Sequence, residues 1–220
     1  MLHYNNIKDP KCQVLFILFL DFFLENLKKG LKVTVKFVIM IITFIERSFD
    51  MLNFLSPDFY FEKYTDITPN FLLERGIKTL LLDVDNTLAP YEQPDPDEKN
   101  MAWLNSLTEN GIGYAFISNN SSDERIKRFN KSIGAPAFAK SGKPLAKKNI
   151  DKALTALSGE RSSTAFVGDQ IFTDVCAGKF NGMRAILVPP IKDKKNLFFR
   201  FKRALERPIL NHYFRKNNNH

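Results

Sequence analysis

The chain reads IKTLLLDVDNT at residues 77–87, an apolar run that ends in two carboxylates. A short, unbroken apolar run of this kind is typical of a strand buried on both faces of a parallel sheet. Asp83 and Asp85 lie two residues apart at its end, so on a regular strand their side chains would share a face. The proline-rich segment 90–96 that follows is typical of a loop. The stretch therefore predicts a buried strand over 77–84 with paired carboxylates at its carboxyl end.

Helix and strand patterns alternate after this stretch. We predict helices over 97–110, 122–133, 145–157 and 175–180, and strands over 114–117, 135–139, 163–167 and 184–188. Such alternation implies right-handed crossovers and a parallel sheet. The predicted fold class is therefore α/β, a doubly wound parallel sheet of the Rossmann-like kind. The stretches from Thr87 to Ser118 and from Lys143 to Asp169 have room for about one helix each, so we expect little or no cap domain.

Polar residues follow most of the predicted strands. The residues concerned are Ser118, Asn119, Lys143, Asp169 and Asp174, in addition to Asp83 and Asp85. Ligands of parallel sheets bind at the carboxyl ends of the strands, so these residues predict an active site at one edge of the sheet. Lys140, three residues before Lys143, is an alternative source of the positive charge.

These residue types suit phosphoryl transfer. Two neighbouring carboxylates can hold Mg²⁺, which prefers oxygen ligands. One carboxylate can attack phosphorus to give an aspartyl-phosphate, and a second can protonate the leaving oxygen and later activate water. A lysine and a hydroxyl with nearby N–H donors can hold the phosphoryl oxygens. Paired acids alone are common in solvated loops, so the interpretation depends on the whole set of residues.

The set resembles the motifs of a known superfamily. Asp83–Thr87 (DVDNT) resembles the DxDxT motif of HAD superfamily phosphatases, preceded by the expected apolar strand. Ser118, Lys143 and Gly168–Asp174 (GDQIFTD) resemble the second, third and fourth motifs in order and spacing. The sequence from Met51 onward, including SPDFY and FLLERGIK, is similar to YqeG-type class IIIA phosphatases, whose relatives include mitochondrial phosphatidylglycerophosphate phosphatases. The resemblance implies an HAD-like fold.

The resemblance also implies a role for each site residue. Asp83 would be the nucleophile and Asp85 the general acid/base. Mg²⁺ would be the cofactor, bound by Asp83, the backbone carbonyl of Asp85, and Asp169. The phosphate-binding group would comprise Thr87, Ser118, Asn119 and Lys143, with Thr87 steadying the motif loop. Asp174 would support the site by orienting Lys143 or by completing the outer shell of the metal.

Residues 1–50 form an apolar extension that is separate from this pattern. Val14–Leu24 and Phe37–Ile45 are the most apolar stretches of the chain. Neither reaches the ~18 uninterrupted apolar residues expected of a transmembrane helix. One interpretation is a hairpin at a membrane surface. The other is that translation starts at Met51 and that residues 1–50 are not part of the natural protein.

Charge and cysteine content bear on partners and location. The formal net charge is +8, and residues 191–220 carry nine Lys/Arg against two acids. This basic tail, separate from a phosphatase domain at 51–190, predicts a helix that either packs on the domain or lies on anionic lipid. Cys12 and Cys176 form no metal or disulfide motif, which favours a reducing, cytoplasmic location.

The leading hypothesis is a Mg²⁺-dependent phosphomonoester hydrolase. Its substrate would be a phosphorylated small molecule or a phospholipid, and the family resemblance favours phosphatidylglycerophosphate. The protein would be cytoplasmic or peripheral on the inner face of the membrane. The alternative is a non-enzymatic protein of the same fold that binds RNA or a membrane surface through its basic tail. Nucleic acid is not favoured, because no recognisable binding module is present.

Overall fold

A computed structural model describes residues 49–120, 123–192 and 197–217. The chain divides into two compact units, Leu55–Lys194 and a second made of Met1–Phe54 with Lys195–His220. The apolar stretches Val14–Leu24 and Phe37–Ile45 lie outside the described residues. Among the helices of the described part, none is both long and apolar enough to cross a membrane.

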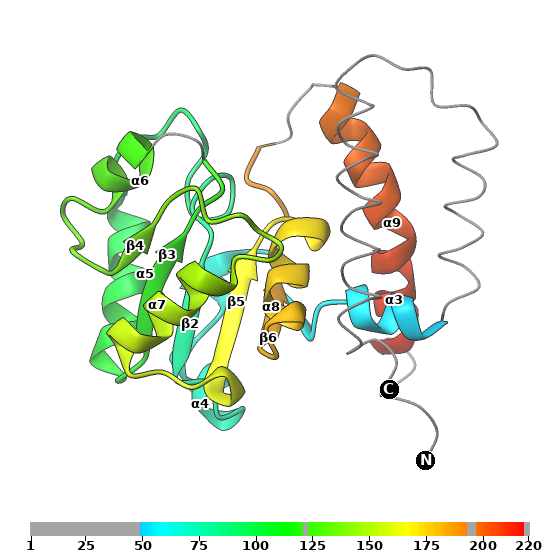
Figure 1. Ribbon diagram of the computed structural model, residues 1–220, viewed down its shortest axis with the longest axis horizontal. Coiled ribbons are helices and arrows are strands. Elements are labelled where there is room, and N and C mark those ends of the chain that lie inside the picture. The colour runs from blue at the N-terminus through cyan, green and yellow to red at the C-terminus, as the bar shows by residue number, and fades with distance from the viewer. Residues whose placement is uncertain (1–48, 121–122, 193–196, 218–220) are drawn as a thin grey trace. The chain divides into compact units, whose positions relative to one another are not determined.

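The unit Leu55–Lys194 is built on a parallel sheet (Figure 1). Its strands are β1 (Phe59–Tyr60), β2 (Thr79–Leu82), β3 (Gly113–Ile117), β4 (Ala137–Phe138), β5 (Thr164–Gly168) and β6 (Arg184–Leu187). They lie in the order β1-β6-β5-β2-β3-β4, and each neighbouring pair is parallel. The change of direction on either side of β2 is the topological switch point at which α/β sheets bind ligands.

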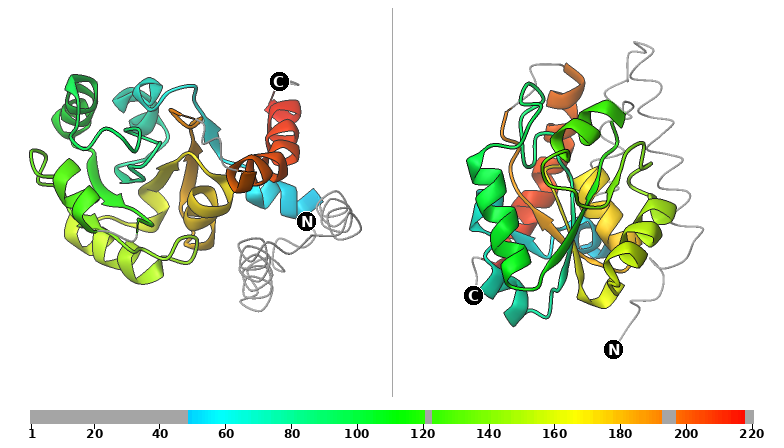
Figure 2. Two further views of the ribbon diagram at one scale, coloured as in Figure 1. Left: turned by 90° about the horizontal axis from the view of Figure 1, so that it is seen from above. Right: turned by 90° about the vertical axis from the view of Figure 1, so that its left-hand side faces the viewer.

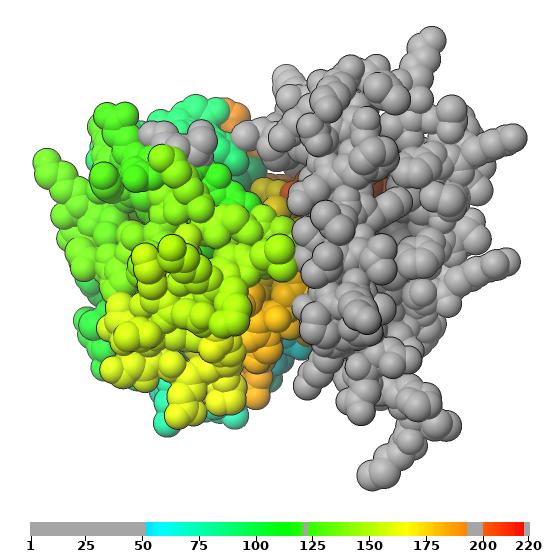
Figure 3. Space-filling view, in the orientation of Figure 1, coloured from blue at the N-terminus to red at the C-terminus, as the bar shows by residue number. Residues whose placement is uncertain are grey.

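Helices cover both faces of this sheet (Figure 2). The helices α4 (Pro69–Glu74), α5 (Glu98–Glu109) and α6 (Asp123–Phe129) pack on one face, and α7 (Lys147–Leu157) and α8 (Cys176–Phe180) on the other. The side chains of β2 alternate accordingly. Leu80 and Leu82 join the core that holds Trp103, whereas Leu81 joins the core that holds Ile150. In the space-filling view the yellow-green atoms of α7 form part of the outer surface of this unit (Figure 3). The predicted doubly wound α/β fold is confirmed.

Local sequence explains where the helices begin. Asp97 caps α5, because its side chain accepts a hydrogen bond from the backbone N–H of Asn100, and the side chain of Asn100 accepts one in return. Trp103 of α5 is buried and donates from Nε1 to the carbonyl of Ile67 at 2.9 Å. Trp103 is therefore part of the core.

The boundaries of several elements differ from the prediction. The strand predicted over 77–84 is confined to β2, so Asp83 and Asp85 belong to the connection that follows it. The helix predicted over 122–133 ends at Phe129. A π-helical turn, η3 (Ile171–Val175), precedes α8, and two short 3-10 turns, η1 (Tyr64–Asp66) and η2 (Arg161–Ser163), lie elsewhere in this unit. Within the described residues, the long connections hold only α5 and the pair α7 and η2, as expected for a protein with little or no cap.

The described part of the second unit comprises most of α3 (Phe49–Leu55) and the whole of α9 (Leu197–Asn217). The helix predicted in the basic tail is confirmed, and α9 carries six Lys/Arg against one Glu. The two helices are joined through Asn53, whose Oδ1 lies 3.1 Å from Nε2 of His212 and 3.3 Å from Nζ of Lys216.

Candidate active site

Asp83 lies buried at the carboxyl end of β2, in the middle of the sheet. Its backbone N–H continues the sheet by donating to the carbonyl of Val167 at 2.9 Å. Its carboxylate is held on both sides. Oδ2 accepts a hydrogen bond from Oγ1 of Thr87 at 3.1 Å, and Oδ1 accepts one from Nζ of Lys143 at 2.5 Å. The Asp83 side chain is therefore fixed in place by partners on two different connections.

Lys143 is the cation of this site. Its side chain is buried, and its Nζ donates to Asp83 and, at 2.6 Å, to Oδ1 of Asp174. The rival Lys140 is exposed and lies 3.6 Å from Asp123, outside the cluster. Asn119 holds the loop that carries Lys143, because its Oδ1 accepts from the backbone N–H of Lys143 at 2.8 Å and its Nδ2 donates to the Lys143 carbonyl at 3.0 Å. The Asn119 amide therefore holds the backbone of Lys143 in place.

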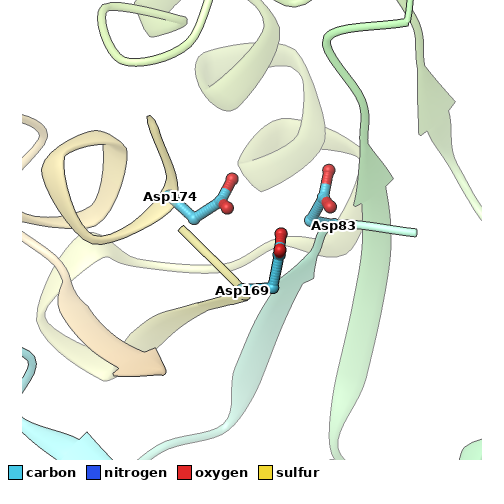
Figure 4. A group of neighbouring side chains, drawn as sticks. All are labelled: Asp83, Asp169 and Asp174. Atoms are coloured by element: carbon cyan, nitrogen blue, oxygen red, sulfur yellow. The ribbon is translucent and has the colours of Figure 1, made fainter. Parts of the chain in front are cut away.

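Three buried carboxylates meet beside Lys143. One oxygen from each of Asp83, Asp169 and Asp174 lies within 4.8 Å of the others. Figure 4 shows the three side chains with their carboxylates near one another. Asp174 comes from the π-helical turn and lies against Gly168, where an added Cβ would be 2.3 Å from the Cβ and Cγ of Asp174. Only glycine leaves Asp174 the room to join the group.

The charges of this group are not balanced by Lys143 alone. Burial raises the pKa of Asp83 to about 8, against the opposing effect of Lys143 and with the help of the charges on Asp174 and Asp169. For Lys143, burial favours loss of the proton, but Asp174 and Asp83 outweigh it and raise the pKa of the ammonium. Three carboxylates face one ammonium, and all are buried. A divalent cation with a preference for oxygen ligands fits this donor set and supplies the missing positive charge.

Asp85 is directed away from the three carboxylates. Its Oδ1 accepts from Nε of Arg125 in α6 at 3.0 Å, and its Oδ2 accepts from Nδ2 of Asn120 at 3.2 Å. The side chain of Asp85 therefore plays no part in the carboxylate group at the candidate metal site. Sequence reasoning missed Arg125, because an arginine in a basic helix such as DERIKRF is most simply read as a solvated residue.

Asn86 joins the motif loop to the segment that follows β6. Its φ of 70° is in the left-handed region, which asparagine tolerates better than most residues. Its backbone carbonyl accepts from the N–H of Ile191 at 2.9 Å. Its side chain donates from Nδ2 to the Lys192 carbonyl at 2.8 Å and accepts from the Lys192 N–H at 3.1 Å. This set of three hydrogen bonds, here called the Asn86 clamp, fixes the chain next to Asp85.

Most of the predicted site residues are thus brought together at one edge of the sheet. Ser118 is buried at the end of β3, and its Oγ accepts from the backbone N–H of Asn120 at 3.0 Å. Thr87 donates a hydrogen bond to the Asp83 carboxylate. Asp174 contacts Lys143 and also joins the carboxylate group.

A buried carboxylate at the carboxyl end of the central strand, held by a lysine and flanked by further carboxylates, is the arrangement of an HAD-type phosphatase. The family model described as mitochondrial PGP phosphatase matches residues 42–192. The chain belongs to this family, whose members are phosphatases of the HAD superfamily.

Individual relatives and solved structures are also similar to this chain. The probable phosphatase YqeG of Bacillus subtilis (strain 168) is 34% identical over 164 residues, which cover 74% of this chain and 94% of that protein. A crystal structure of an uncharacterized protein from Listeria monocytogenes serotype 4b has a TM-score of 0.42 at 18% identity and covers 55% of this chain and 85% of that one. The 3-deoxy-D-manno-octulosonate 8-phosphate phosphatase of Moraxella catarrhalis, in complex with magnesium, phosphate and KDO, has a TM-score of 0.38 at 17% identity, with coverage of 69% and 99%.

Proposed function

We propose that this phosphatase hydrolyses a phosphomonoester through an aspartyl-phosphate on Asp83, with Mg²⁺ as its cofactor. The observation that carries the proposal is the placement of the Asp83 carboxylate between Lys143 and Thr87, beside Asp169 and Asp174. A nucleophile fixed in this way needs little reorganisation when a phosphoryl group arrives. Lys143, freed from part of its contact with Asp83, can then hold a phosphoryl oxygen.

The reaction divides into two displacements on phosphorus. In the first, a carboxylate oxygen of Asp83 attacks, the bond from phosphorus to the leaving oxygen breaks, and Asp85 gives that oxygen a proton. In the second, water attacks the aspartyl-phosphate, Asp85 takes the proton of the water, and the bond from Asp83 to phosphorus breaks. Inorganic phosphate leaves, and both carboxyl groups return to their starting states.

The metal would be held by Asp83, Asp169 and Asp174, together with the backbone carbonyl of Asp85 that the family resemblance implies. A bound Mg²⁺ offsets the charge of the phosphoryl group and favours the ionised form of Asp83. Ser118, at the end of β3, is the proposed donor to a phosphoryl oxygen. Asn119 supports this arrangement indirectly, through Lys143.

Phosphatidylglycerophosphate is the proposed substrate, and the surroundings of the site support a lipid. Of the four large apolar side chains that are exposed in the described residues, three belong to segments that form the site. Leu145 (47% exposed) follows the Lys143 loop, and Ile191 (47% exposed) belongs to the Asn86 clamp. The third is Tyr91 (37% exposed), whose pKa is raised by burial and by the charges of Asp85, Asp83 and Asp169. Apolar side chains beside a phosphate site suit a substrate whose phosphate is attached to an apolar body.

The basic helix α9 independently supports a membrane-associated substrate. It carries a net charge of +5, from six Lys/Arg and one Glu. A helix of this charge that also has aromatic side chains is suited to an anionic lipid surface. In this proposal α9 keeps the enzyme at the membrane, and the site acts on headgroup phosphates.

The test is phosphate release by the full chain from phosphatidylglycerophosphate in mixed micelles and from soluble phosphomonoesters. We expect release from the lipid, lost in Asp83→Asn and on addition of a chelator. Asp95→Asn is the matched control, because Asp95 is an exposed carboxylate that pairs with Arg128 away from the carboxylate group. Release from soluble esters alone would retain the mechanism and refute the lipid substrate. No release by a folded, Mg²⁺-loaded protein would refute the proposed function.

A further inference from the structure

Arg125 is a partly buried arginine that contacts Asp85 rather than the three carboxylates. Its side chain is 13% exposed, and that of its partner Asp85 is 8% exposed. Nε donates to Asp85, Nη2 donates to the carbonyl of Pro90 at 3.0 Å, and Nη1 donates to the carbonyl of Gln93. The guanidinium therefore ties one oxygen of Asp85 to two points on the loop that follows the motif.

The geometry of these contacts requires an arginine. A planar guanidinium presents its N–H donors in a fixed fork, so it can reach three acceptors in different directions at once. The ammonium of a lysine is a point charge and cannot reproduce this arrangement. The ring of Phe129 lies 5.8 Å from the guanidinium carbon and is fully buried, which limits the movement of the Arg125 side chain.

Arg128, one turn further along α6, shows what an ordinary surface arginine of this helix does. It pairs with Asp95 at 2.9 Å, and both side chains are 58% exposed. An exposed pair of this kind contributes little to stability. Both arginines lie on α6 and each pairs with an aspartate, but of the two only Arg125 pairs with a residue of the phosphatase motif.

We propose that Arg125 is a positioning residue that holds the Asp85 carboxyl group within reach of the leaving oxygen of the substrate. The proposal rests on the role of Asp85 as general acid/base in the function proposed above. With Oδ1 bound to Arg125 and Oδ2 near Asn120, Asp85 cannot turn toward the carboxylate group and Lys143. Arg125 also holds the loop that carries Tyr91, so the same side chain positions Asp85 and this loop.

This role predicts a dependence on the leaving group. An alkyl ester needs a proton on its leaving oxygen as the bond to phosphorus breaks, whereas p-nitrophenolate departs without one. Misplacement of Asp85 therefore impairs both displacements for an alkyl ester, but only the water-activating step for p-nitrophenyl phosphate. A defect confined to folding or to substrate binding would lower the turnover of both esters alike.

The experiment compares kcat/KM, which includes the first displacement but not the hydrolysis of the common aspartyl-phosphate, for phosphatidylglycerophosphate in mixed micelles and for p-nitrophenyl phosphate, with Mg²⁺, in the full chain. Arg125→Gln is expected to lower kcat/KM for the alkyl ester about 10- to 100-fold, the cost of a misplaced proton donor, and to lower kcat/KM for the aryl ester several-fold less. Arg125→Lys is not expected to restore the wild-type kcat/KM for the alkyl ester. Arg128→Gln is the matched control and should leave both values unchanged.

Asn120→Ala provides a second variant in case Arg125→Gln does not fold. It removes the hydrogen bond to the other oxygen of Asp85 and should give a smaller effect that also falls more heavily on the alkyl ester. Equal losses on both esters, or values like those of Arg128→Gln, would overturn the positioning role. Inactivity of the wild-type protein on both esters would instead refute the proposed function, so the two failures are distinguishable.

Discussion

The ammonium of Lys143 lies 2.5 Å from Oδ1 of Asp83, and both side chains are buried. The pair comes from two connections that are 60 residues apart in the chain. The same ammonium contacts Asp174 on its other side. Lys143 therefore neutralises part of the charge of Asp83 and part of the charge of Asp174.

Replacement of Lys143 by methionine should abolish activity and weaken the fold. The change removes a buried cation from between two carboxylates. Loss of the partner of a buried charge lowers the free energy of unfolding by about 3–5 kcal/mol. Loss of a donor to the transferring group lowers kcat by about 10²–10³. Urea unfolding and phosphate release measure the two effects. Lys140→Met should change neither, because Lys140 is exposed; similar losses in both variants would contradict the assignment of Lys143.

Stability without metal should fall as pH rises toward about 8. The folded protein retains a proton on Asp83 up to about pH 8, whereas the unfolded chain loses it near the ordinary value of 3.8. Because the folded state binds more protons between these limits, its free energy of unfolding decreases with pH in that window. Mg²⁺ must displace this proton, so its affinity should rise over the same range.

Thermal unfolding with and without Mg²⁺ at pH 5.5 and pH 8.5 measures this linkage. Mg²⁺ at about 100 times its Kd adds about 2.7 kcal/mol to the free energy of unfolding, which raises Tm by roughly 5–10 °C for a domain of this size. The Mg²⁺-induced shift should be larger at the higher pH. Asp83→Asn should remove most of the pH dependence, and a shift that is equal at both pH values would contradict a proton held at Asp83.

Gly168→Ala should damage the site through Asp174. The new Cβ would lie 2.3 Å from atoms of the Asp174 side chain, so Asp174 has to move away from Lys143 and Asp83. We expect at least about a tenfold loss of activity, weaker Mg²⁺ binding, and a stability cost of about 1–3 kcal/mol from overpacking. Gly113→Ala is a suitable control, because the nearest atom to its Cβ is a Leu157 carbon at 3.6 Å. Normal Mg²⁺ affinity in Gly168→Ala would show that Asp174 is not needed for the metal.

Polar replacement of Leu145 and Ile191 should affect lipid hydrolysis alone. In Leu145→Ser/Ile191→Ser the apolar surface beside the site is lost, while the backbone hydrogen bond of Ile191 can remain. Activity on phosphatidylglycerophosphate in vesicles should fall about tenfold, and activity on p-nitrophenyl phosphate should stay the same. Leu73 is equally exposed but lies on α4, before the amino end of β2, so Leu73→Ser is the control. A decrease in all variants, or in none, would argue against contact of Leu145 and Ile191 with lipid.

The central strand and the carboxylates at its end were predictable because their signals are local. The apolar run over β2 indicates a buried strand. Asp83 directly follows β2 and Asp169 directly follows β5, and the parallel pairing of these two strands brings both aspartates to one edge of the sheet. Lys143 could be preferred to Lys140 in sequence only through the adjacent Pro144 and the family resemblance. The structure separates the two by burial.

Other features depend on contacts between distant residues. The two-residue strand β1 exists because Phe59 and Tyr60 pair with Ile186 and Leu187, and such a short segment carries no periodic signal. Arg125 has the sequence context of a surface residue, and its partner Asp85 is 40 residues away. The direction in which Asp85 points is therefore a property of the tertiary structure alone.

The Asn86 clamp sets the boundary of the working enzyme. The sheet ends at Leu187, and an engineer trimming the chain to its regular elements would cut soon after that residue. Such a cut would remove Ile191 and Lys192, which hold Asn86 next to Asp85 although neither belongs to a helix or a strand. A minimal fragment of this phosphatase should therefore end beyond Lys192. The segment after β6 is needed because it holds the loop of the DxDxT motif through Asn86.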